Sequence, residues 1–345
     1  MLGTYDEPWG AAIAPGTELL FITERRGSVK IQDLKSGRWA TLTGLPKVDY
    51  GGQGGLGDIA FVPAETGPTF KQRTIYLSWI EADAGGDKRG AVVGRGTVRC
   101  GVADECAVEN LQVIWRQAPK VTGRGHFSHR LAISPDGKYL YVASGDRQKF
   151  TPAQDLSDNL GKVLRLKLDG TPAAGNPFAS QGATSAQIWT YGHRNILGLQ
   201  FDTKGQLWEL EHGPKGGDEL NLVKPGQNYG WPLVSDGDHY DGKVIPRHIT
   251  RPDLAAPAIS WNPVIAPGDF IFYSGKLWPQ WKGQALIAGL GSKGLVRVRI
   301  DGPKATEQAR YPLGKRIREM QEAADGALLV LEDGPGGRLL RLTPP

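Results

Sequence analysis

A β-hairpin pattern that recurs along the chain constrains its fold more than any other feature of the sequence. In each copy an apolar run meets a tight turn containing glycine, and a second apolar run follows and ends at an acidic residue. The copies span residues 11–24, 131–146, 199–213 and 320–334. Asp-Gly and related turns between apolar runs are a strong hairpin signal, because glycine readily adopts the positive φ that they require. The chain is therefore predicted to consist of repeated antiparallel hairpins.

The spacing of the turns gives the number of repeats. The turn glycines at positions 16, 137, 205 and 326 lie 121, 68 and 121 residues apart, so each long gap has room for one degenerate copy. Residues 73–79 and 284–289 are the candidates for these two copies. Six units of roughly 60 residues result, a period typical of propeller blades.

A third strand is expected after the hairpins, because the runs 28–32, 162–168, 295–300 and 338–342 alternate apolar and charged residues. The prediction is an all-β fold, a six-bladed β-propeller with four-stranded antiparallel blades. Common blades have roughly 40–50 residues, so we expect the surplus to form long inter-strand loops. We expect residues 1–345 to form a single domain with little helix, since no long segment has an apolar stripe at helical spacing.

Composition and charge narrow the class of ligand. Glycine (48) and proline (24) make up about a fifth of the 345 residues, as suits many strands joined by turns. The 41 Lys and Arg exceed the 36 Asp and Glu by five but form no basic run, so a small anionic ligand is favoured and no nucleic acid is expected. No stretch approaches the roughly 20 apolar residues of a membrane span. Residues 1–6 do not resemble a secretory signal, so any such signal has been removed or never existed.

Two cysteines, Cys100 and Cys106, enclose a short loop. With no further Cys or His at metal spacing, they form either a small disulfide in an oxidising compartment or two free thiols. Two matches to G-x-G-x-x-G, at 52–57 and 289–294, are each followed by a strand-like run rather than a helix. They therefore do not indicate dinucleotide binding.

A set of polar motifs remains, and together they make the chain resemble a known family. They are Gln53 in Gly-Gly-Gln-Gly-Gly-Leu, His126-Phe-Ser-His-Arg-Leu131, Tyr191-Gly-His-Arg-Asn195, His212-Gly-Pro-Lys-Gly-Gly-Asp-Glu219, Asn228-Tyr-Gly-Trp-Pro232 and Arg316-Ile-Arg318. In this order and spacing the chain resembles the soluble quinoprotein aldose sugar dehydrogenases, the glucose and sorbosone dehydrogenase family that depends on pyrroloquinoline quinone (PQQ). The resemblance runs from Pro8 to Leu342.

The resemblance implies a cofactor site. PQQ carries three carboxylates on a flat orthoquinone, so its pocket needs fixed cations, and arginine suits bidentate pairing with carboxylates. The family's cofactor-binding positions correspond here to Gln53, Arg194, Asn195, Lys293, Arg316 and Arg318. Arg194 would also act in catalysis by stabilising negative charge that grows on the quinone oxygen.

Calcium is the second implied cofactor. By resemblance, the backbone carbonyls of Gly213 and Pro214 bind the Ca²⁺ that contacts PQQ, and this hard ion accepts carbonyl oxygens readily. Glu219 and the carbonyl of Tyr229 would serve a second, structural Ca²⁺. Asp218 either belongs to the region of this second Ca²⁺ or is a solvated loop residue.

His126 is the expected general base. An imidazole titrates near neutral pH and can take the hydroxyl proton at a sugar's anomeric carbon while hydride leaves that carbon. His129 is the competing candidate and is expected to line the pocket or to be structural. Trp231 and Trp261 are expected near the sugar or the cofactor.

The implied function is oxidation of aldose sugars at C1 to the lactone, with hydride passing to PQQ and electrons then passing to an unidentified external acceptor. Glucose-oxidising members have Asp immediately before the catalytic His where this chain has Gly125, so a broad range of aldoses is expected. The family is usually periplasmic or secreted. Two alternatives stay open: a Ca²⁺-dependent six-bladed lactonase, and a non-catalytic propeller that binds carbohydrate or protein.

Overall fold

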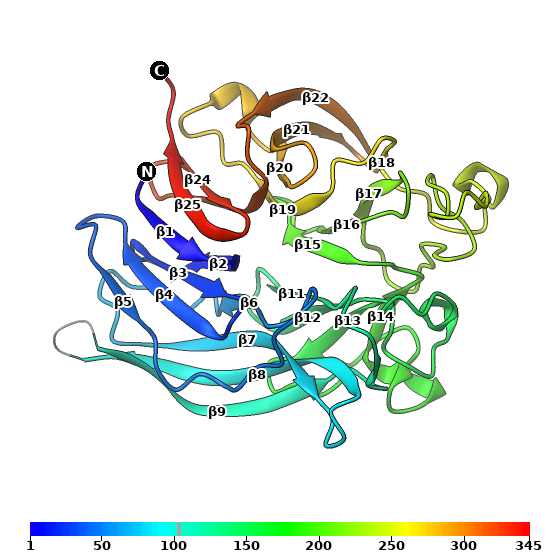
Figure 1. Cartoon of the computed structure of the whole chain (residues 1–345), viewed down its shortest axis with the longest axis horizontal. Coiled ribbons are helices and arrows are strands. Elements are labelled where there is room, and N and C mark those ends of the chain that lie inside the picture. The colour runs from blue at the N-terminus through cyan, green and yellow to red at the C-terminus, as the bar shows by residue number, and fades with distance from the viewer. Residues whose placement is uncertain (102–104) are drawn as a thin grey trace.

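A computed structural model of the chain describes residues 1–101 and 105–345. Across these residues the strands form six antiparallel sheets arranged around a central axis, which confirms the six-bladed β-propeller (Figure 1). The helices in this part of the chain are short 3-10 segments: η2 (Thr151–Gln154), η3 (Ala179–Gln181), η4 (Ser185–Gln187), η5 (His248–Thr250) and η6 (Pro279–Trp281). Low helical content was predicted and is confirmed. None of these helices has the length and apolarity to cross a membrane.

Each sheet is one blade, numbered here in chain order. Blade 1 contains β2 (Pro8–Ile13), β3 (Leu19–Glu24), β4 (Ser28–Asp33) and β5 (Trp39–Thr41). Blade 2 contains β6 (Leu56–Phe61), β7 (Gln72–Ala82), β8 (Lys88–Cys100) and β9 (Cys106–Arg116), with β10 (Val121–Thr122) also paired to β8. Blade 3 contains β11 (Ser128–Ile133), β12 (Tyr139–Ser144), β13 (Lys162–Lys167) and β14 (Ile188–Tyr191).

The second half of the ring repeats this order. Blade 4 contains β15 (Ile196–Phe201), β16 (Leu207–Glu211), β17 (Asp218–Leu222) and β18 (Ile259–Trp261). Blade 5 contains β19 (Pro267–Phe272), β20 (Ala285–Gly289), β21 (Gly294–Asp301) and β22 (Lys304–Pro312). Blade 6 contains β23 (Ile317–Glu322), β24 (Leu328–Glu332), β25 (Pro335–Leu342) and β1 (Gly3–Asp6).

The predicted hairpins are the first two strands of blades 1, 3, 4 and 6, and the two degenerate copies fall on β7 and β20. Burial explains the difference between inner and outer strands. Ser128–Ile133, the innermost strand of blade 3, is buried at every position, whereas Lys304–Pro312, the outermost strand of blade 5, alternates exposed and half-buried residues. Inner strands are covered on both faces by neighbouring blades and are therefore nearly continuous apolar runs.

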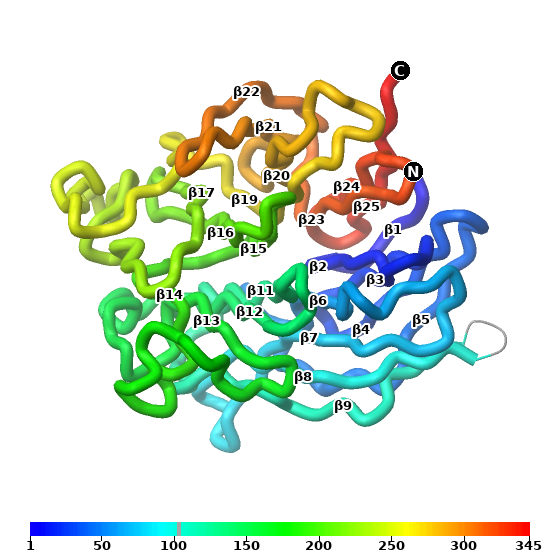
Figure 2. The backbone as a smooth tube through the Cα atoms, turned by 180° about the vertical axis from the view of Figure 1, so that it is seen from behind, coloured from blue at the N-terminus to red at the C-terminus, as the bar shows by residue number. Residues whose placement is uncertain are grey.

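The blades close into a ring through their innermost strands β2, β6, β11, β15, β19 and β23, each of which contacts the next, and β23 contacts β2. A separate apolar cluster fills the space between each pair of neighbouring blades. The last blade joins the two ends of the chain, because β1 pairs antiparallel with β25, Gly3 facing Leu339 (Figure 2).

A buried arginine on β11 ties the ring together at its centre. Arg130 donates to the carbonyls of Leu197 (2.7 Å) and Gly268 (2.8 Å) and to the carboxylates of Glu319 (2.7 Å) and Asp58 (3.3 Å). Its guanidinium carbon also lies 4.2 Å from the centre of the Trp9 ring. These partners lie on β15, β19, β23, β6 and β2. The Arg130 side chain therefore contacts the innermost strand of each of the five other blades.

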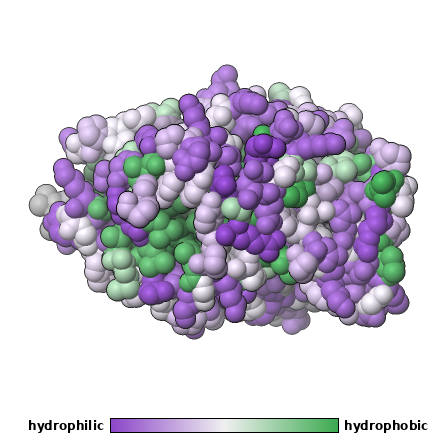
Figure 3. All heavy atoms as spheres, turned by 90° about the horizontal axis from the view of Figure 1, so that it is seen from above, coloured by the Kyte–Doolittle hydropathy of each residue, from purple (hydrophilic) through white to green (hydrophobic). Residues whose placement is uncertain are grey.

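One end of the ring collects the loops that precede the innermost strands and follow the second strands, because these strands are antiparallel neighbours. The pairing register shifts near this end of all six innermost strands, as between Ser128 and Leu131. Bulges of this kind re-aim side chains next to functional sites. The surface in Figure 3 is mostly hydrophilic, with apolar side chains in separate patches.

Candidate functional site

A cavity of about 180 Å³ lies at this loop-bearing end, close to the axis. Its described lining includes three cations, Arg25, Arg316 and Arg318, and no acidic side chain. Gln53 and Asn195 add two amides to the same wall. A pocket with this lining suits an anionic ligand that accepts hydrogen bonds.

The paired arginines of blade 6 share one carboxylate. Arg316 donates Nε–H to Asp333 Oδ2 at 2.9 Å, and Arg318 donates Nε–H to Asp333 Oδ1 at 2.9 Å. Burial alone would raise the pKa of Asp333, but the charges of Arg318 and Arg316 hold it below its usual value. One carboxylate against two guanidinium groups leaves this wall with a net positive charge.

His126 is held by a buried carboxylate. Its Nδ1 lies 2.7 Å from Oδ1 of Asp146, a fully buried residue that also accepts Trp231 Nε1–H at 2.7 Å and the backbone N–H of Gln148 at 2.8 Å. The backbone N–H of His126 donates to Gln53 Oε1 at 2.7 Å. Because ionised Asp146 can only accept, Nδ1 carries the proton and Nε2 is left as a lone pair, the form that a general base requires.

Arg194 and Asn195 stand beside this pair on the loop before β15. Their backbone N–H groups both donate to Glu211 Oε2, at 2.6 and 3.2 Å. Arg194 Nη1 donates to the carbonyl of His212 at 2.9 Å, and its guanidinium lies over the Trp231 ring at 5.2 Å. Arg194 Nε is buried without a partner among the described residues. A buried donor with no acceptor is costly and indicates a position where a ligand would supply one.

His212 connects the arginine-lined cavity with the Gly-Pro turn. It lines the central cavity and two neighbouring hollows that also include Gly213 and Pro214. Its Nε2 donates to the Pro267 carbonyl at 2.6 Å. Burial first, and then the nearby charge of Arg194, lowers the pKa of His212 to about 3, so this imidazole is neutral.

The predicted calcium positions lie around that turn. Among residues 1–101 and 105–345, no hydrogen bond ends on the carbonyl oxygens of Gly213, Pro214 or Tyr229. Glu219 is buried and lies 3.2 Å from His248 Nε2. Asp218 accepts the N–H groups of Gly213 and Ala266 at 2.9 and 2.7 Å and is 1% exposed, so the alternative that it is a solvated loop residue is wrong.

Trp261 and Lys293, which the sequence associated with this site, are not among the described residues that line the arginine-lined cavity. Trp261 is buried in the apolar cluster between blades 4 and 5 and donates Nε1–H to Glu307, so the expectation that it lines the sugar or cofactor slot is wrong. Lys293 is exposed on the turn between β20 and β21 and is not among the described residues that line the cavity. Leu290 of the same turn does line it.

His129, the other candidate for the general base, is held in place by packing. Its ring stacks on Trp9 with centroids 4.7 Å apart, and its Nδ1 lies 2.9 Å from Ser78 Oγ. Burial, followed by the charge of Arg130, lowers its pKa to about 3. His129 lines the cavity as a neutral ring.

Several site residues were not predicted from the sequence, above all Asp146, Asp333 and Glu211. Each follows or ends the second strand of a hairpin, at the acidic position that recurs in the repeat pattern. Each also bonds the group that precedes or begins the first strand of the same hairpin. The repeat itself was therefore the signal that could have identified them. Arg25, which follows β3, had no such signal.

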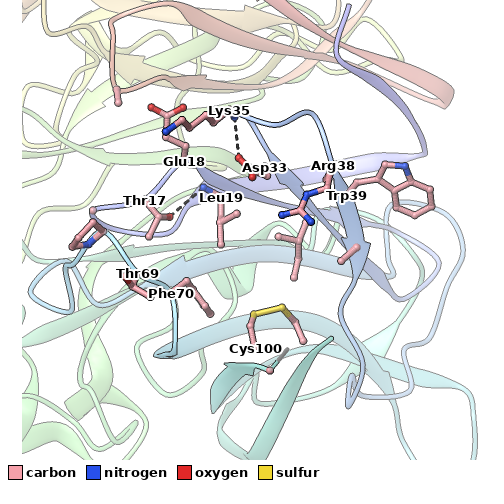
Figure 4. A pocket seen from close by; sticks show the side chains of 17 residues that line it. Thr17, Glu18, Leu19, Asp33, Lys35, Arg38, Trp39, Thr69, Phe70 and Cys100 are labelled. Carbon is pink, nitrogen blue, oxygen red and sulfur yellow. Dashed lines mark hydrogen bonds between the residues drawn. A yellow bond between two sulfur atoms is a disulfide. The ribbon is translucent and has the colours of Figure 1, made fainter. Parts of the chain in front are cut away.

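A larger hollow of about 760 Å³ lies at the opposite end of the sheets, beside the β2–β3 turn (Figure 4). Thr17, Leu19, Trp39 and Phe70 line it, together with the Cys100–Cys106 disulfide. The bridge resolves the alternative that the sequence left open for the two cysteines. This hollow shares no lining residue with the arginine-lined cavity.

Comparison with known proteins agrees with the geometry. The chain matches the family described as Glucose / Sorbosone dehydrogenase over residues 5–341. It is 36% identical over 348 residues to "Aldose sugar dehydrogenase YliI" of Escherichia coli (strain K12), covering 98% of this chain and 90% of that protein.

Two solved structures are similar along the whole chain. The soluble aldose sugar dehydrogenase (Asd) from Escherichia coli in the apo-form has 35% identity and a TM-score of 0.90, covering 100% of this chain and 98% of that one. The PQQ-bound form of aldose sugar dehydrogenase (Adh) from Streptomyces coelicolor has 26% identity and a TM-score of 0.77, covering 99% and 95%. The chain belongs to the glucose/sorbosone dehydrogenase family and is an oxidoreductase.

Proposed function

We propose that this protein oxidises aldose sugars at C1 to the lactone, using bound PQQ and Ca²⁺ and passing the electrons to an external acceptor. The observation that carries the proposal is the buried His126–Asp146 pair, joined by the His126 backbone N–H to Gln53 in the wall of a cavity with three arginines and no described acidic residue. Family membership and the PQQ-bound relative support the choice of cofactor.

The residues present suit PQQ. Its three carboxylates need cations, and Arg25, Arg316 and Arg318 face one cavity. The unpartnered Nε–H of Arg194 is a ready donor for a quinone oxygen, and the Asn195 amide lines the same cavity. Lys293 is retained as a cofactor-binding residue in this proposal because its turn borders the cavity at Leu290.

His126 would move the proton. Its Nε2 lone pair would accept the C1 hydroxyl proton of the sugar, and Asp146 would stabilise the imidazolium that forms. When bound, PQQ would supply the oxidant that accepts hydride from C1. Arg194 would stabilise the negative charge that develops on the quinone oxygen, with its backbone held in place by Glu211.

Calcium would bind at the Gly213 and Pro214 carbonyls, which accept no described hydrogen bond. A hard oxygen-binding ion suits these groups, and the neutral His212 beside them adds no competing charge. A second, structural Ca²⁺ would use Glu219 and the carbonyl of Tyr229.

The ring of residues 1–345 acts as one domain. The protein works in the periplasm or outside the cell, which the Cys100–Cys106 disulfide supports. The substrate range is broad, because Gly125 offers the sugar no side chain; a Cβ there would lie 2.6 Å from the Gln148 side chain.

The test is reconstitution. Purified apoprotein is mixed with PQQ and Ca²⁺, and the shift in quinone absorbance and the reduction of a dye with glucose are followed. We expect a stoichiometric absorbance shift and dye reduction that depends on sugar. Dye reduction no faster than in the cofactor-free control would contradict the proposal, and gluconolactone hydrolysis without PQQ would instead support the lactonase.

The His126→Ala variant tests the general base. We expect it to keep the absorbance shift on PQQ binding and to lose turnover by about 10²–10⁴-fold, the usual contribution of general-base catalysis. The matched control is His239→Ala, a change of a half-buried histidine on the loop after β17 whose ring contacts Phe150 and makes no bond to Asp146. Turnover retained in His126→Ala would move the base elsewhere.

A further inference from the structure

A second polar site lies directly behind the Arg194–Asn195 loop. His193, Glu209 and Glu211 are buried, and one possible ligand atom from each lies within 4.8 Å of the other two. Glu209 and Glu211 alternate on β16 and therefore share one face of the strand, while His193 comes from the loop before β15. The opposite face of β16 carries Trp208 and Leu210, which pack in the apolar cluster toward blade 5.

The distances in this cluster are too long for hydrogen bonds. His193 Nδ1 lies 3.5 Å from Glu209 Oε1 and 3.6 Å from Glu211 Oε1. Hydrogen bonds between nitrogen and oxygen measure about 2.7–3.2 Å. His193 Nδ1 and Glu209 Oε2 are both buried with no hydrogen-bond partner among the described residues. Two fully buried polar atoms of different residues are thus left unsatisfied in one place, which is costly unless a ligand fills it.

The same distances suit a metal ion. Ligand atoms about 2.0–2.1 Å from a tetrahedral ion lie about 3.3 Å from one another. A divalent ion would also balance the two carboxylates, which are otherwise buried close together at a high electrostatic cost.

Each candidate ligand is already oriented by a further bond. His193 Nε2 lies 2.9 Å from Thr190 Oγ1, so donation of Nε2–H to this hydroxyl leaves Nδ1 as a lone pair. Glu209 Oε1 accepts Asn221 Nδ2–H at 2.6 Å. Glu211 Oε2 accepts the two backbone N–H groups of Arg194 and Asn195, which leaves Oε1 directed at His193. Metal ligands characteristically have such outer partners.

We propose that His193, Glu209 and Glu211 bind a divalent first-row transition-metal ion such as Zn²⁺ or Mn²⁺. One imidazole nitrogen with two carboxylates suits these ions, whereas Ca²⁺ prefers oxygen ligands alone. Its ligand set differs from that of the proposed Ca²⁺ positions at Gly213 and Tyr229, which adjoin it: Glu211 borders the same small hollow, and the His193 ring stacks on that of Tyr229. It does not depend on the proposed dehydrogenase activity. Since Glu211 also holds the Arg194 and Asn195 backbone, the ion would fix that loop.

Metal titration of the full chain tests the proposal. Protein stripped with a chelator is saturated with Ca²⁺ and then titrated with Zn²⁺ or Mn²⁺ by calorimetry. We expect one equivalent to bind. Loss of an outer partner costs 10–100-fold in metal affinity, so His193→Gln and Glu209→Gln, which remove a ligand, are expected to weaken binding by about 100-fold or more.

Glu219→Gln is the matched control. It removes a neighbouring buried carboxylate that contacts the shared residue Asn221, and its effect on Zn²⁺ affinity is expected to be below about threefold. Circular dichroism of the metal-free variants checks that they fold. Equal Zn²⁺ affinity in wild type and in folded His193→Gln would overturn the proposal, as would a loss in Glu219→Gln as large as that in Glu209→Gln.

A crystal of the wild-type protein soaked in Zn²⁺ decides the question without any variant. We expect an anomalous peak at the zinc absorption edge about 2.0–2.1 Å from His193 Nδ1. A zinc peak only at Glu219 and Tyr229, or no ordered peak at all, would contradict the assignment and leave a proton shared between His193 and the two glutamates as the occupant of the cluster.

Discussion

At the scale of single residues, the site depends on acidic side chains that orient other groups. Asp146 fixes the His126 ring, Glu211 fixes the Arg194 backbone, and Asp333 joins Arg316 to Arg318. None of these carboxylates is among the described residues that line the central cavity. Their contribution is to hold tautomer and position, which a catalytic group needs as much as its own chemistry.

Asp146→Asn is therefore expected to lower kcat by about 10²–10⁴-fold. The neutral amide can no longer stabilise an imidazolium, and its N–H₂ favours the wrong tautomer of His126. The measurement is steady-state dye reduction, with the quinone absorbance shift as a check on cofactor binding. The milder control is Trp231→Phe, which removes only one of the bonds to Asp146. A kcat within threefold of wild type would exclude this role for Asp146.

At the scale of elements, single buried side chains shape the long loops. The loop between β12 and β13 is held by Lys162, whose Nζ donates to the carbonyls of Pro152 at 2.8 Å and Leu160 at 2.5 Å. Asp158 lies 3.5 Å away as a partly exposed counter-charge. This ammonium is completely buried, although the sequence places it in an ordinary alternating strand.

Lys162→Met is expected to lower the free energy of unfolding by about 1–3 kcal/mol, because it leaves the Leu160 carbonyl without a donor and removes one of two donors from the Pro152 carbonyl. Chemical denaturation followed by tryptophan fluorescence measures the loss. Lys167→Met changes an exposed residue of the same strand and is expected to stay within about 0.5 kcal/mol. Equal effects of the two changes would show that the Nζ contacts do not stabilise the loop.

The burial of Lys162 also predicts that the free energy of unfolding depends on pH. Burial lowers its pKa to about 8 in the folded protein, below the unfolded value near 10.5. Between these two values the unfolded chain binds a proton that the folded chain does not, so stability from this group rises with pH over about 8 to 10.5.

The difference in unfolding free energy between wild type and Lys162→Met isolates this contribution from other groups. It is expected to grow by up to roughly 1.4 kcal/mol per pH unit within that window and to be flat below it. A flat difference across the whole window would mean that the Lys162 ammonium is not desolvated in the folded protein.

Prediction from the sequence was most accurate for hairpins whose turn is short and contains an Asp-Gly pair. Asp136-Gly137 and Asp325-Gly326 marked hairpins that the structure confirms. Blade 2 was harder, since a longer loop joins β6 to β7 and no Asp-Gly turn marks it. The packing role of Trp261 was also unavailable to the sequence, because its apolar surroundings come from another blade.

At the scale of the whole molecule, the ring is held by its closing strand pair and by Arg130 at its centre. Arg130 donates to Glu319 and Asp58 at the centre of the ring, and desolvation by burial is the main cause that raises the pKa of Asp58 to about 6. Two buried carboxylates thus rely on one guanidinium.

Arg130→Met is expected to lower the free energy of unfolding by about 3–5 kcal/mol, the usual cost of leaving a buried charge unpaired. Thermal or chemical unfolding measures it. Arg251→Met removes an exposed ion pair with Asp253 and serves as the control, with an expected cost of at most about 1 kcal/mol. A loss in Arg130→Met no larger than in this control would remove Arg130 as the central tie.

The hairpins that deliver the site's groups each carry their own anchoring acid, and this has an evolutionary consequence. Asp146 with His126, Glu211 with Arg194, and Asp333 with Arg318 are each paired within one hairpin, while Trp231 and Gln53 add bonds to the first pair from other blades. Descendants of such a protein can change one hairpin together with its acidic residue while the acidic residues of the other hairpins keep their own contacts. New sugar preferences can therefore arise blade by blade on an unchanged frame.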